Sequence, residues 1–324
     1  MRRFMIYCLL FLMVFHLTGC QNFEEPMTQP TETTEAPTQP TSDYQKSDPS
    51  EDDTLNLLMI GNSGCYYYVE ELYGLAKAAG IKMRVCNVYY SGCTLSQHWN
   101  WWVAKEANYD YYPTDENGRV KAEGKVDLEW CLQQQNWDFI SLQEGGNAAF
   151  RTGTTKTLFA ARQMYLNDLL GYLKKQFPMS TLLWQQNSAY QIGYNKSFSV
   201  TSLEDQENDT QVFRDFAIAV QEKYGIDWIP RGDAALRMRQ GGYDKLCARL
   251  GYGTNHEGDY YHDGDVGGGQ YLTACVWLEV LTGRSCIGNS YRPVYTYKEE
   301  IFTLDEDLIT KLQQAAHDAV EDLK

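Results

Sequence analysis

An apolar run that ends in a small polar turn is the feature that most constrains this chain. Residues 55–60 are long and apolar enough for a buried strand, and the run stops at Gly-Asn-Ser-Gly (61–64). A helical pattern follows over about 69–79. In open α/β sheets, ligands bind beyond the carboxyl ends of the strands. Ser63 therefore occupies the position where an α/β hydrolase would hold a nucleophile.

Strand-like and helix-like segments alternate along the remaining chain. This alternation predicts an α/β domain over 55–324, with a parallel sheet that helices cover on both faces. The stretch near 97–125 is aromatic and has no clear period, and we interpret it as an insertion. Strands are expected at 55–60, 82–90, 137–142, 181–184 and 227–229, and helices at 69–79, 128–135, 158–177, 211–224, 268–282 and 305–323.

The first 54 residues are expected to lie outside the folded domain. Arg2 and Arg3 precede an apolar stretch that is too short for a membrane-spanning helix, and Leu-Thr-Gly-Cys follows it. That ending resembles the bacterial lipobox, so we predict that 1–20 is a lipoprotein signal peptide and that Cys20 is lipidated. The polar segment 21–54 is rich in Thr and Pro and is predicted to be a disordered tether. The protein is thus expected to be extracytoplasmic and anchored to the bacterial cell membrane.

The chain is acidic, with a net charge of −15, and over half of this charge lies in the tether. Such a balance argues against a nucleic-acid partner. Seven cysteines remain after the signal peptide, at spacings that match no zinc site. A disulfide between Cys65 and Cys93 is one possibility, because both residues follow predicted strands.

Serine needs a base to take its proton, and the base needs an acceptor that fixes its tautomer. His262 is the better candidate base, and Asp259, three residues earlier, can place a carboxylate beside its ring. An oxyanion also needs hydrogen-bond donors that are already in position. The backbone N–H groups of Ser63 and Gly92 and the side-chain amide of Asn147 are the candidates.

These segments resemble the sequence blocks of the SGNH (GDSL-like) hydrolases. Gly-Asn-Ser63 is similar to block I, Gly92 to the block II glycine, 138–147 to block III, and Asp259-x-x-His262 to block V. The chain looks closest to an uncharacterised branch of secreted bacterial proteins. The resemblance implies a three-layer α/β/α sandwich with a flavodoxin-like sheet, and ester hydrolysis that needs no metal and no cofactor. Block III departs from the family pattern, so Gln143 is an alternative to Asn147 as the oxyanion donor.

Each candidate residue has a competing interpretation. Ser63 is also a suitable helix N-cap residue, and Cys65 is a rival nucleophile. The remaining alternatives are His256 as the base, His98 as a cleft or structural residue, His317 as a solvated residue, and a calcium loop from Glu257, Asp263 and Asp265.

The prediction for function is a surface-anchored serine esterase that removes acyl groups, usually acetyl, from carbohydrates. Aromatic residues are dense near the expected cleft and suit stacking against sugars. A carbohydrate-binding lipoprotein that has lost catalysis is the alternative, and an acyl transferase or phosphodiesterase on the same scaffold also stays open. The aromatic residues are Tyr66, Tyr67, Tyr68, Trp99, Trp101, Trp102, Tyr109, Tyr111 and Tyr112.

Overall fold

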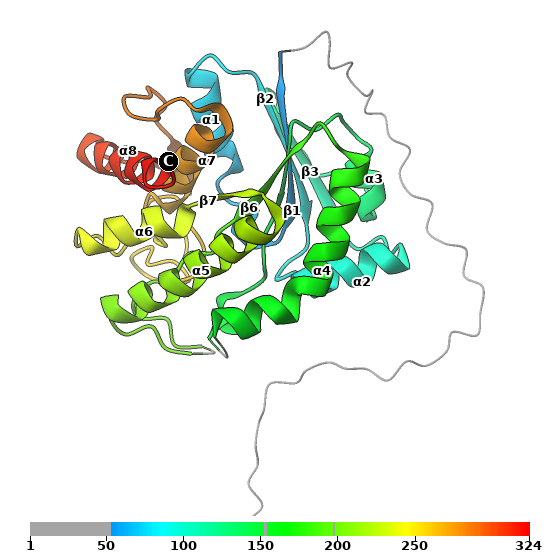
Figure 1. Cartoon of the computed structure of the whole chain (residues 1–324). Helices are drawn as coiled ribbons and strands as arrows, with labels where there is room; N and C mark the ends of the chain where they lie inside the picture. Colours follow the sequence, from blue (N-terminus) through cyan, green and yellow to red (C-terminus); the bar gives the residue numbers. More distant parts are fainter. Residues whose placement is uncertain (1–52, 152–153, 197) are drawn as a thin grey trace, which may run out of the picture. The chain divides into compact units, whose positions relative to one another are not determined.

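The computed structural model describes residues 53–324 apart from 152–153 and 197 (Figure 1). The predicted signal peptide and nearly all of the predicted tether lie outside the described residues. Strand β1 begins at Leu55, the first residue of the predicted domain. Within the described residues, no helix combines the length and the apolar character needed to cross a bilayer.

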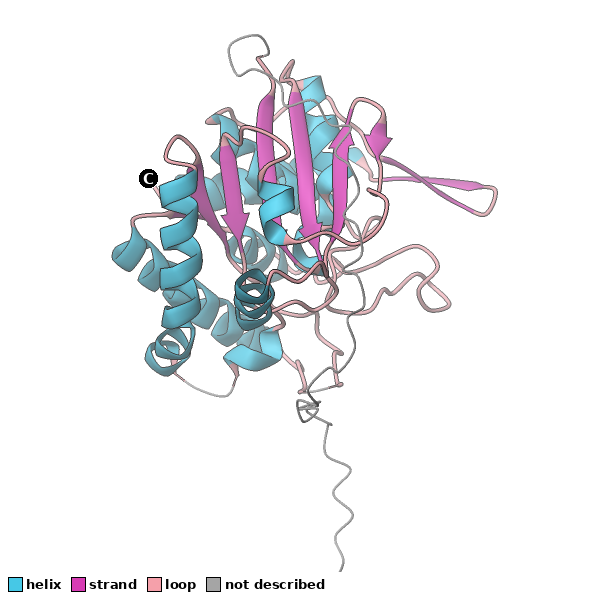
Figure 2. Cartoon of the chain, turned by 90° about the vertical axis from the view of Figure 1, so that its right-hand side faces the viewer, coloured by secondary structure: helices cyan, strands magenta, loops and turns pink. Residues whose placement is uncertain are grey.

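A seven-stranded sheet occupies the centre of the domain, with its strands side by side (Figure 2). The spatial order is β4-β3-β2-β1-β5-β6-β7, in which β2, β1, β5, β6 and β7 run parallel and β3 and β4 are antiparallel. Numbered along the chain, the five parallel strands have the flavodoxin-like order 2-1-3-4-5. This order confirms the predicted fold class. The strands are β1 (Leu55–Gly61), β2 (Met83–Tyr89), β3 (Asp110–Asp115), β4 (Gly118–Arg119), β5 (Phe139–Leu142), β6 (Thr181–Gln185) and β7 (Asp227–Ile229), and β8 (Val294–Tyr297) pairs with β9 (Glu300–Thr303) in a separate hairpin.

Helices cover both faces of the sheet and give the domain three layers (Figure 1). A hydrophobic core lies on each face, between the sheet and its helices. Strand β1 contributes to both because successive side chains of a strand point to opposite faces. Leu57 and Met59 pack into the first core, and Leu58 and Ile60 into the second. The helices of the first core are α1 (Val69–Ala78), α6 (Arg231–Gln240), α7 (Gly269–Thr282) and α8 (Glu306–Glu321), and those of the second are α2 (Leu95–Ala104), α3 (Leu128–Leu132), α4 (Thr155–Gln176) and α5 (Leu203–Tyr224).

The stretch near 97–125, expected to be an irregular insertion, has regular structure instead. It contains most of α2 and both antiparallel strands, β3 and β4, which extend the sheet beyond β2. Helix α2 begins with a capping box, in which Thr94 accepts from the N–H of Gln97 and the Gln97 side chain accepts from the N–H of Thr94.

The carboxyl ends of the parallel strands bring polar residues to one edge of the sheet. Ser63 follows β1 in a short 3-10 turn, η1 (Ser63–Cys65), and Gly92 follows β2. A second turn, η2 (Asn147–Phe150), follows β5. Gln185 ends β6, and Arg231 opens α6 just after β7. Distant parts of the chain therefore meet at this edge, as the parallel topology requires.

Candidate active site

A pocket of about 200 Å³ lies at this edge of the sheet. It brings together Ser63, Gly92, Gln143, Asn147 and His262, which the sequence places far apart. The full lining is Asn62, Ser63, Gly64, Gly92, Gln143, Glu144, Gly145, Gly146, Asn147, Gln185, Asn187, Ser188, Tyr190, Arg231, Tyr261 and His262. We call this cavity the reactive pocket.

The turn that carries Ser63 is capped by its neighbour and not by the serine itself. Asn62 Oδ1 accepts from the N–H of Gly64 at 2.8 Å, and Asn62 Nδ2 donates to the carbonyl oxygen of Cys93 at 2.8 Å. The Ser63 hydroxyl makes no hydrogen bond to any described residue, and Ser63 is half-buried in the pocket wall. The hydroxyl is therefore left for a ligand, and the N-cap interpretation of Ser63 is wrong.

A network of hydrogen bonds among buried polar side chains supports this turn. Gln143 Nε2 donates to Asn62 Oδ1 at 2.6 Å, and Gln185 Nε2 donates to Gln143 Oε1 at 2.6 Å and to the carbonyl oxygen of Gly64 at 2.7 Å. The hydroxyl of Tyr68 donates to Gln185 Oε1. All four side chains are buried, so each hydrogen bond restricts the position of the turn without competition from water.

His262 and Asp259 form the predicted pair. Nδ1 of His262 lies 2.7 Å from Asp259 Oδ2, and Asp259 Oδ1 accepts from the backbone N–H groups of Tyr261 and His262. Burial alone would raise the pKa of the Asp259 carboxyl, but the hydrogen bonds and charge of His262 and these N–H groups hold that pKa below its usual value. An ionised carboxylate only accepts, so the proton lies on Nδ1 and Nε2 is left as the acceptor.

Two tyrosine rings hold the imidazole in place. The ring centroid of Tyr67 lies 4.8 Å from that of His262, and the centroid of Tyr261 lies 4.1 Å from it. The side chains of His262 and Asp259 are only 14% and 11% exposed. Their orientation is thus fixed by packing as well as by hydrogen bonding.

The candidate oxyanion donors all line the reactive pocket. The N–H groups of Ser63 and Gly92 have no hydrogen-bond acceptor among the described residues, and Gly92 has a φ of 68°, which favours glycine. Asn147 Nδ2 donates to the Ser188 carbonyl oxygen at 2.6 Å, and its Oδ1 accepts from Asn187 at 2.9 Å. Asn147 therefore keeps one amide hydrogen for the pocket, and so does Gln143, whose Nε2 donates only to Asn62 Oδ1.

Among the pocket residues that the sequence analysis missed are Gln185 and Arg231. Arg231 donates to the carbonyl oxygen of Gly64 and pairs with Asp263 at 3.3 Å. Both follow the same rule that identifies Ser63, because they stand at the carboxyl ends of β6 and β7. A polar residue at the end of a predicted strand was the sequence signal that could have identified both residues.

The other candidate histidines lie outside the reactive pocket. His98 is fully buried, its Nδ1 lies 2.8 Å from the Tyr109 hydroxyl, and burial lowers the pKa of its ring to about 3. It is therefore structural. His256, the rival base, accepts from the N–H of Gly251 at 3.1 Å through Nδ1 and packs near the rings of Tyr297 and Phe302.

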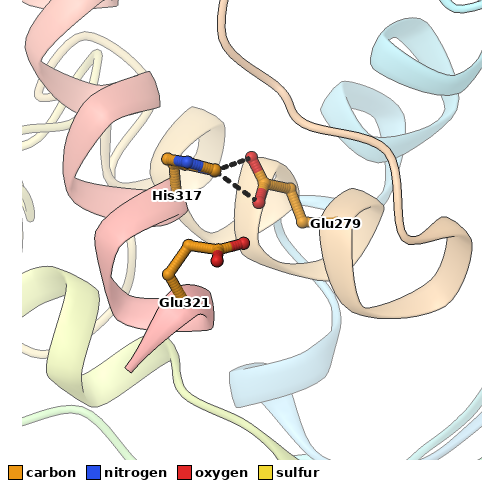
Figure 3. A group of neighbouring side chains, drawn as sticks. All are labelled: Glu279, His317 and Glu321. Atoms are coloured by element: carbon orange, nitrogen blue, oxygen red, sulfur yellow. Dashed lines mark hydrogen bonds and ion pairs between the residues drawn. The ribbon is translucent and has the colours of Figure 1, made fainter. Parts of the chain in front are cut away.

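His317 is not a freely solvated residue, contrary to expectation. Its Nδ1 lies 3.0 Å from Oε2 of the buried Glu279, so it joins α8 to α7 (Figure 3). Glu279, His317 and Glu321 form the only group of three side chains among the described residues whose ligand atoms lie close enough together to hold a metal ion. Glu279 Oε1 also accepts from the N–H of Cys286 at 2.6 Å, so this carboxylate is occupied by contacts between helix and loop.

The rival chemistries find no support in the structure. Cys65 is buried, its thiol donates to the Asn62 carbonyl oxygen, and burial raises the pKa of the thiol to about 12, which leaves almost no thiolate at neutral pH. Cys65 and Cys93 are free thiols in the opposite cores, so the disulfide considered as one possibility is not formed. In the described part of the chain, the carboxylates of the predicted calcium loop do not converge, since Asp263 pairs with Arg231 and Thr273.

The aromatic residues of the cleft differ from those expected. Tyr68, Tyr109 and Tyr111 are buried, and the three tryptophans of α2 pack against the second core. Of the predicted set, Tyr67 is the residue that reaches the cleft beside His262. The other rings of that region come from Tyr190, Tyr194, Tyr252, Tyr260 and Tyr261.

A family model described as "Domain of unknown function (DUF4886)" matches residues 56–317, which include every residue of the reactive pocket. The chain belongs to the DUF4886 family. No curated protein matches this DUF4886 sequence. The crystal structure of a DUF4886 family protein from Bacteroides uniformis is similar, with a TM-score of 0.66, 25% identity, and coverage of 83% of this chain and 95% of that chain.

Weaker structural similarities link this DUF4886 chain to named hydrolases. A GDSL-like lipase from Parabacteroides merdae has a TM-score of 0.44 at 16% identity, over 71% of this chain and 95% of that chain. A family 3 carbohydrate esterase from Clostridium thermocellum has a TM-score of 0.42 at 14% identity, over 71% and 98%. Both similarities concern the fold alone.

Proposed function

We propose that this DUF4886 protein is a serine esterase with Ser63 as nucleophile, His262 as general base and Asp259 as the carboxylate partner of His262. One observation supports the proposal most strongly. The reactive pocket holds a serine hydroxyl and an imidazole whose Nδ1 is already bonded to a carboxylate. Neither the Ser63 hydroxyl nor His262 Nε2 is bonded to another described residue, so both are available for a proton transfer.

The proposed mechanism proceeds in two steps. His262 Nε2 takes the proton of the Ser63 hydroxyl as the oxygen attacks the ester carbonyl, and Asp259 stabilises the resulting imidazolium. The N–H groups of Ser63 and Gly92 and the Asn147 amide bind the oxyanion. His262 then gives the proton to the leaving alcohol oxygen. Water attacks the acyl-Ser63 ester by the same route and releases the acid.

The size of the reactive pocket supports a small acyl group. Its volume of about 200 Å³ is below the usual range of pockets that enclose whole ligands. We therefore propose an acetyl ester, with the alcohol part, a carbohydrate, lying outside this pocket. Given the predicted lipid anchor at Cys20, the reaction would take place outside the cell, at the membrane.

The alternative of a carbohydrate-binding protein without catalysis has one observation in its favour. The side-chain amides of both Asn147 and Gln143 already donate a hydrogen bond within the protein. If neither donates to an oxyanion, only two backbone N–H groups remain. Glycan binding without turnover, and without an effect of Ser63→Ala, would support this alternative.

The proposal is tested by hydrolysis of an aryl acetate by the full chain in mild detergent. Ser63→Ala should lower kcat/KM by at least about 10³-fold, because the nucleophile is lost. Ser290→Ala is the matched control, since Ser290 is exposed and lies outside the reactive pocket. Equal rates for the wild type and Ser63→Ala would refute the proposal.

The predicted anchor has its own test. Bacterial cells that express the chain should incorporate radiolabelled palmitate into it, and Cys20→Ser should abolish the incorporation. Labelling that persists in Cys20→Ser would refute lipidation at this residue.

A further inference from the structure

A second cavity lies against the reactive pocket. Its volume is about 690 Å³, and we call it the outer cleft. Tyr261 and His262 line both cavities, so the two are adjacent. An ester whose acyl group occupies the reactive pocket would place its alcohol part in the outer cleft. The residues of the outer cleft used here are Tyr67, Tyr194, Lys196, Tyr252, Tyr261 and His262.

Aromatic rings form much of the wall of the outer cleft. Tyr67 and Tyr261 pack against the His262 ring, and the Tyr194 centroid lies 5.9 Å from that of Tyr261. Tyr67 and Tyr261 are half-buried, so part of each side chain stays accessible. Rings held in this way offer flat apolar surface with a polar edge, which suits a sugar ring.

Two cations lie among these rings. Lys196 Nζ lies 5.1 Å from the Tyr261 centroid. The Arg249 guanidinium stacks between Tyr67, at 4.1 Å, and Tyr252, at 4.9 Å. Cations over aromatic faces keep their full charge, because the ring attracts them without neutralising them.

Neither cation forms an ion pair with a carboxylate of the described residues, although Asp259, which lines the same cleft, acts electrostatically on Arg249. Lys196 and Arg249 form no ion pair there, and Nη1 of Arg249 is buried without a hydrogen-bond partner. Asp259 is the carboxylate of the outer cleft, and its two oxygens accept from His262 and Tyr261. The two cations outnumber this one carboxylate, in a chain whose net charge is −15.

We infer that the outer cleft binds an acidic sugar, with its ring against the tyrosines and its carboxylate held by Lys196. This inference rests on the proposed function. It narrows the substrate to an acetyl ester of a carbohydrate that contains uronic acid. Lys196 offers this carboxylate a charged donor, which a neutral sugar does not use as well. Arg249 does not line the outer cleft and its Nη1 is buried, so it adds only its positive charge.

The test compares two substrates of matched length and acetyl content, an acetylated oligogalacturonate and an acetylated xylo-oligosaccharide. The wild type should prefer the acidic substrate by at least about tenfold in kcat/KM, and added salt should reduce this preference. Lys196→Gln should reduce the preference at least about fivefold, mainly through KM. Arg249→Gln should reduce it less, because Arg249 acts only through its charge. Lys223→Gln is the matched control, because Lys223 also lies over a tyrosine ring, at 6.0 Å from Tyr224, but outside both cavities.

A wild type without preference for the acidic substrate, or a preference unchanged in Lys196→Gln, would overturn the inference while aryl acetate hydrolysis still supports the esterase. Binding provides a readout that needs no turnover. Calorimetry should show that Ser63→Ala binds deacetylated oligogalacturonate, and that adding Lys196→Gln weakens this binding at least about fivefold. Absence of binding, or equal binding by both proteins, would overturn the inference even if the chain proves to have no esterase activity.

Discussion

Arg231 donates a hydrogen bond to the carbonyl oxygen of Gly64, the residue that follows Ser63. The same guanidinium pairs with Asp263, the residue that follows His262. One buried side chain thus joins the turn of the proposed nucleophile to the loop of the proposed base. The relative position of the two catalytic groups therefore depends on a residue that takes no part in the proton transfer.

Replacing Arg231 should lower both the stability of the protein and its rate of ester hydrolysis. Arg231→Ala leaves the Asp263 carboxylate, 14% exposed, without its cation, and the free energy of unfolding should fall by about 3–5 kcal/mol. Urea unfolding measures this change. Arg237→Ala, which removes a more exposed ion pair with Asp322 from the same helix, should cost less than about 1 kcal/mol. Equal losses in the two variants would contradict the structural role of Arg231.

Variants of the two candidate amide donors should differ in their effects on kcat and on stability. Asn147→Ala should lower kcat about 10²- to 10³-fold with little change in KM, because its amide would act on the oxyanion. Gln143→Ala should mainly lower the free energy of unfolding, by about 1–3 kcal/mol, because Asn62 Oδ1 and Gln185 Nε2 each lose one of their two buried hydrogen bonds. A larger loss of kcat in Gln143→Ala than in Asn147→Ala would assign the oxyanion donor to Gln143.

The carboxylate partner of His262 should be essential for turnover. Asp259→Asn keeps the shape but can place a donor against Nδ1, which favours the wrong tautomer, and kcat should fall about 10³- to 10⁴-fold. Glu257→Gln in the same loop serves as the control, because the Glu257 carboxylate accepts from the Asn255 N–H and does not touch His262. An Asp259→Asn enzyme with near wild-type kcat would exclude Asp259 from the mechanism.

Stability should fall as the pH rises from about 4.5 to 7, because of Glu71 in α1. Burial raises the pKa of the Glu71 carboxyl from 4.5 to about 7. The folded protein thus retains a proton that the unfolded chain has already released, and the free energy of unfolding decreases by about 3 kcal/mol over this interval. Glu71→Gln should remove this slope and raise stability above pH 7, measured by urea unfolding at several pH values. Glu70→Gln, at the exposed neighbouring position, should keep the slope, and a slope retained in Glu71→Gln would contradict the assignment.

The sequence predicts the fold and the central residues of the site for a physical reason. Parallel strands end at one edge of a sheet, so Ser63 and Gln143 share that edge once the strands are recognised. The Asp259-x-x-His262 spacing is a local feature, and one turn of chain is enough to bring the carboxylate to the ring. Both inferences need only short segments and a general rule of topology.

Other features depend on contacts that no local pattern encodes. The tryptophans of α2 resemble cleft residues in the sequence, but they pack against the second core. Arg231 could be recognised only by combining the strand-end rule with the position of Gly64, 167 residues away. Helix α2 itself had a readable signal in Thr94-x-x-Gln97, a capping box that the aromatic composition of the stretch obscured.

The central claim is that Ser63 is a nucleophile activated by His262, and covalent labelling tests it most directly. Intact and peptide mass spectrometry after reaction with a fluorophosphonate should show one adduct, on Ser63, and the adduct should be lost in Ser63→Ala and strongly slowed in His262→Ala. An unlabelled wild type, or an adduct on another residue that persists in Ser63→Ala, would contradict the account.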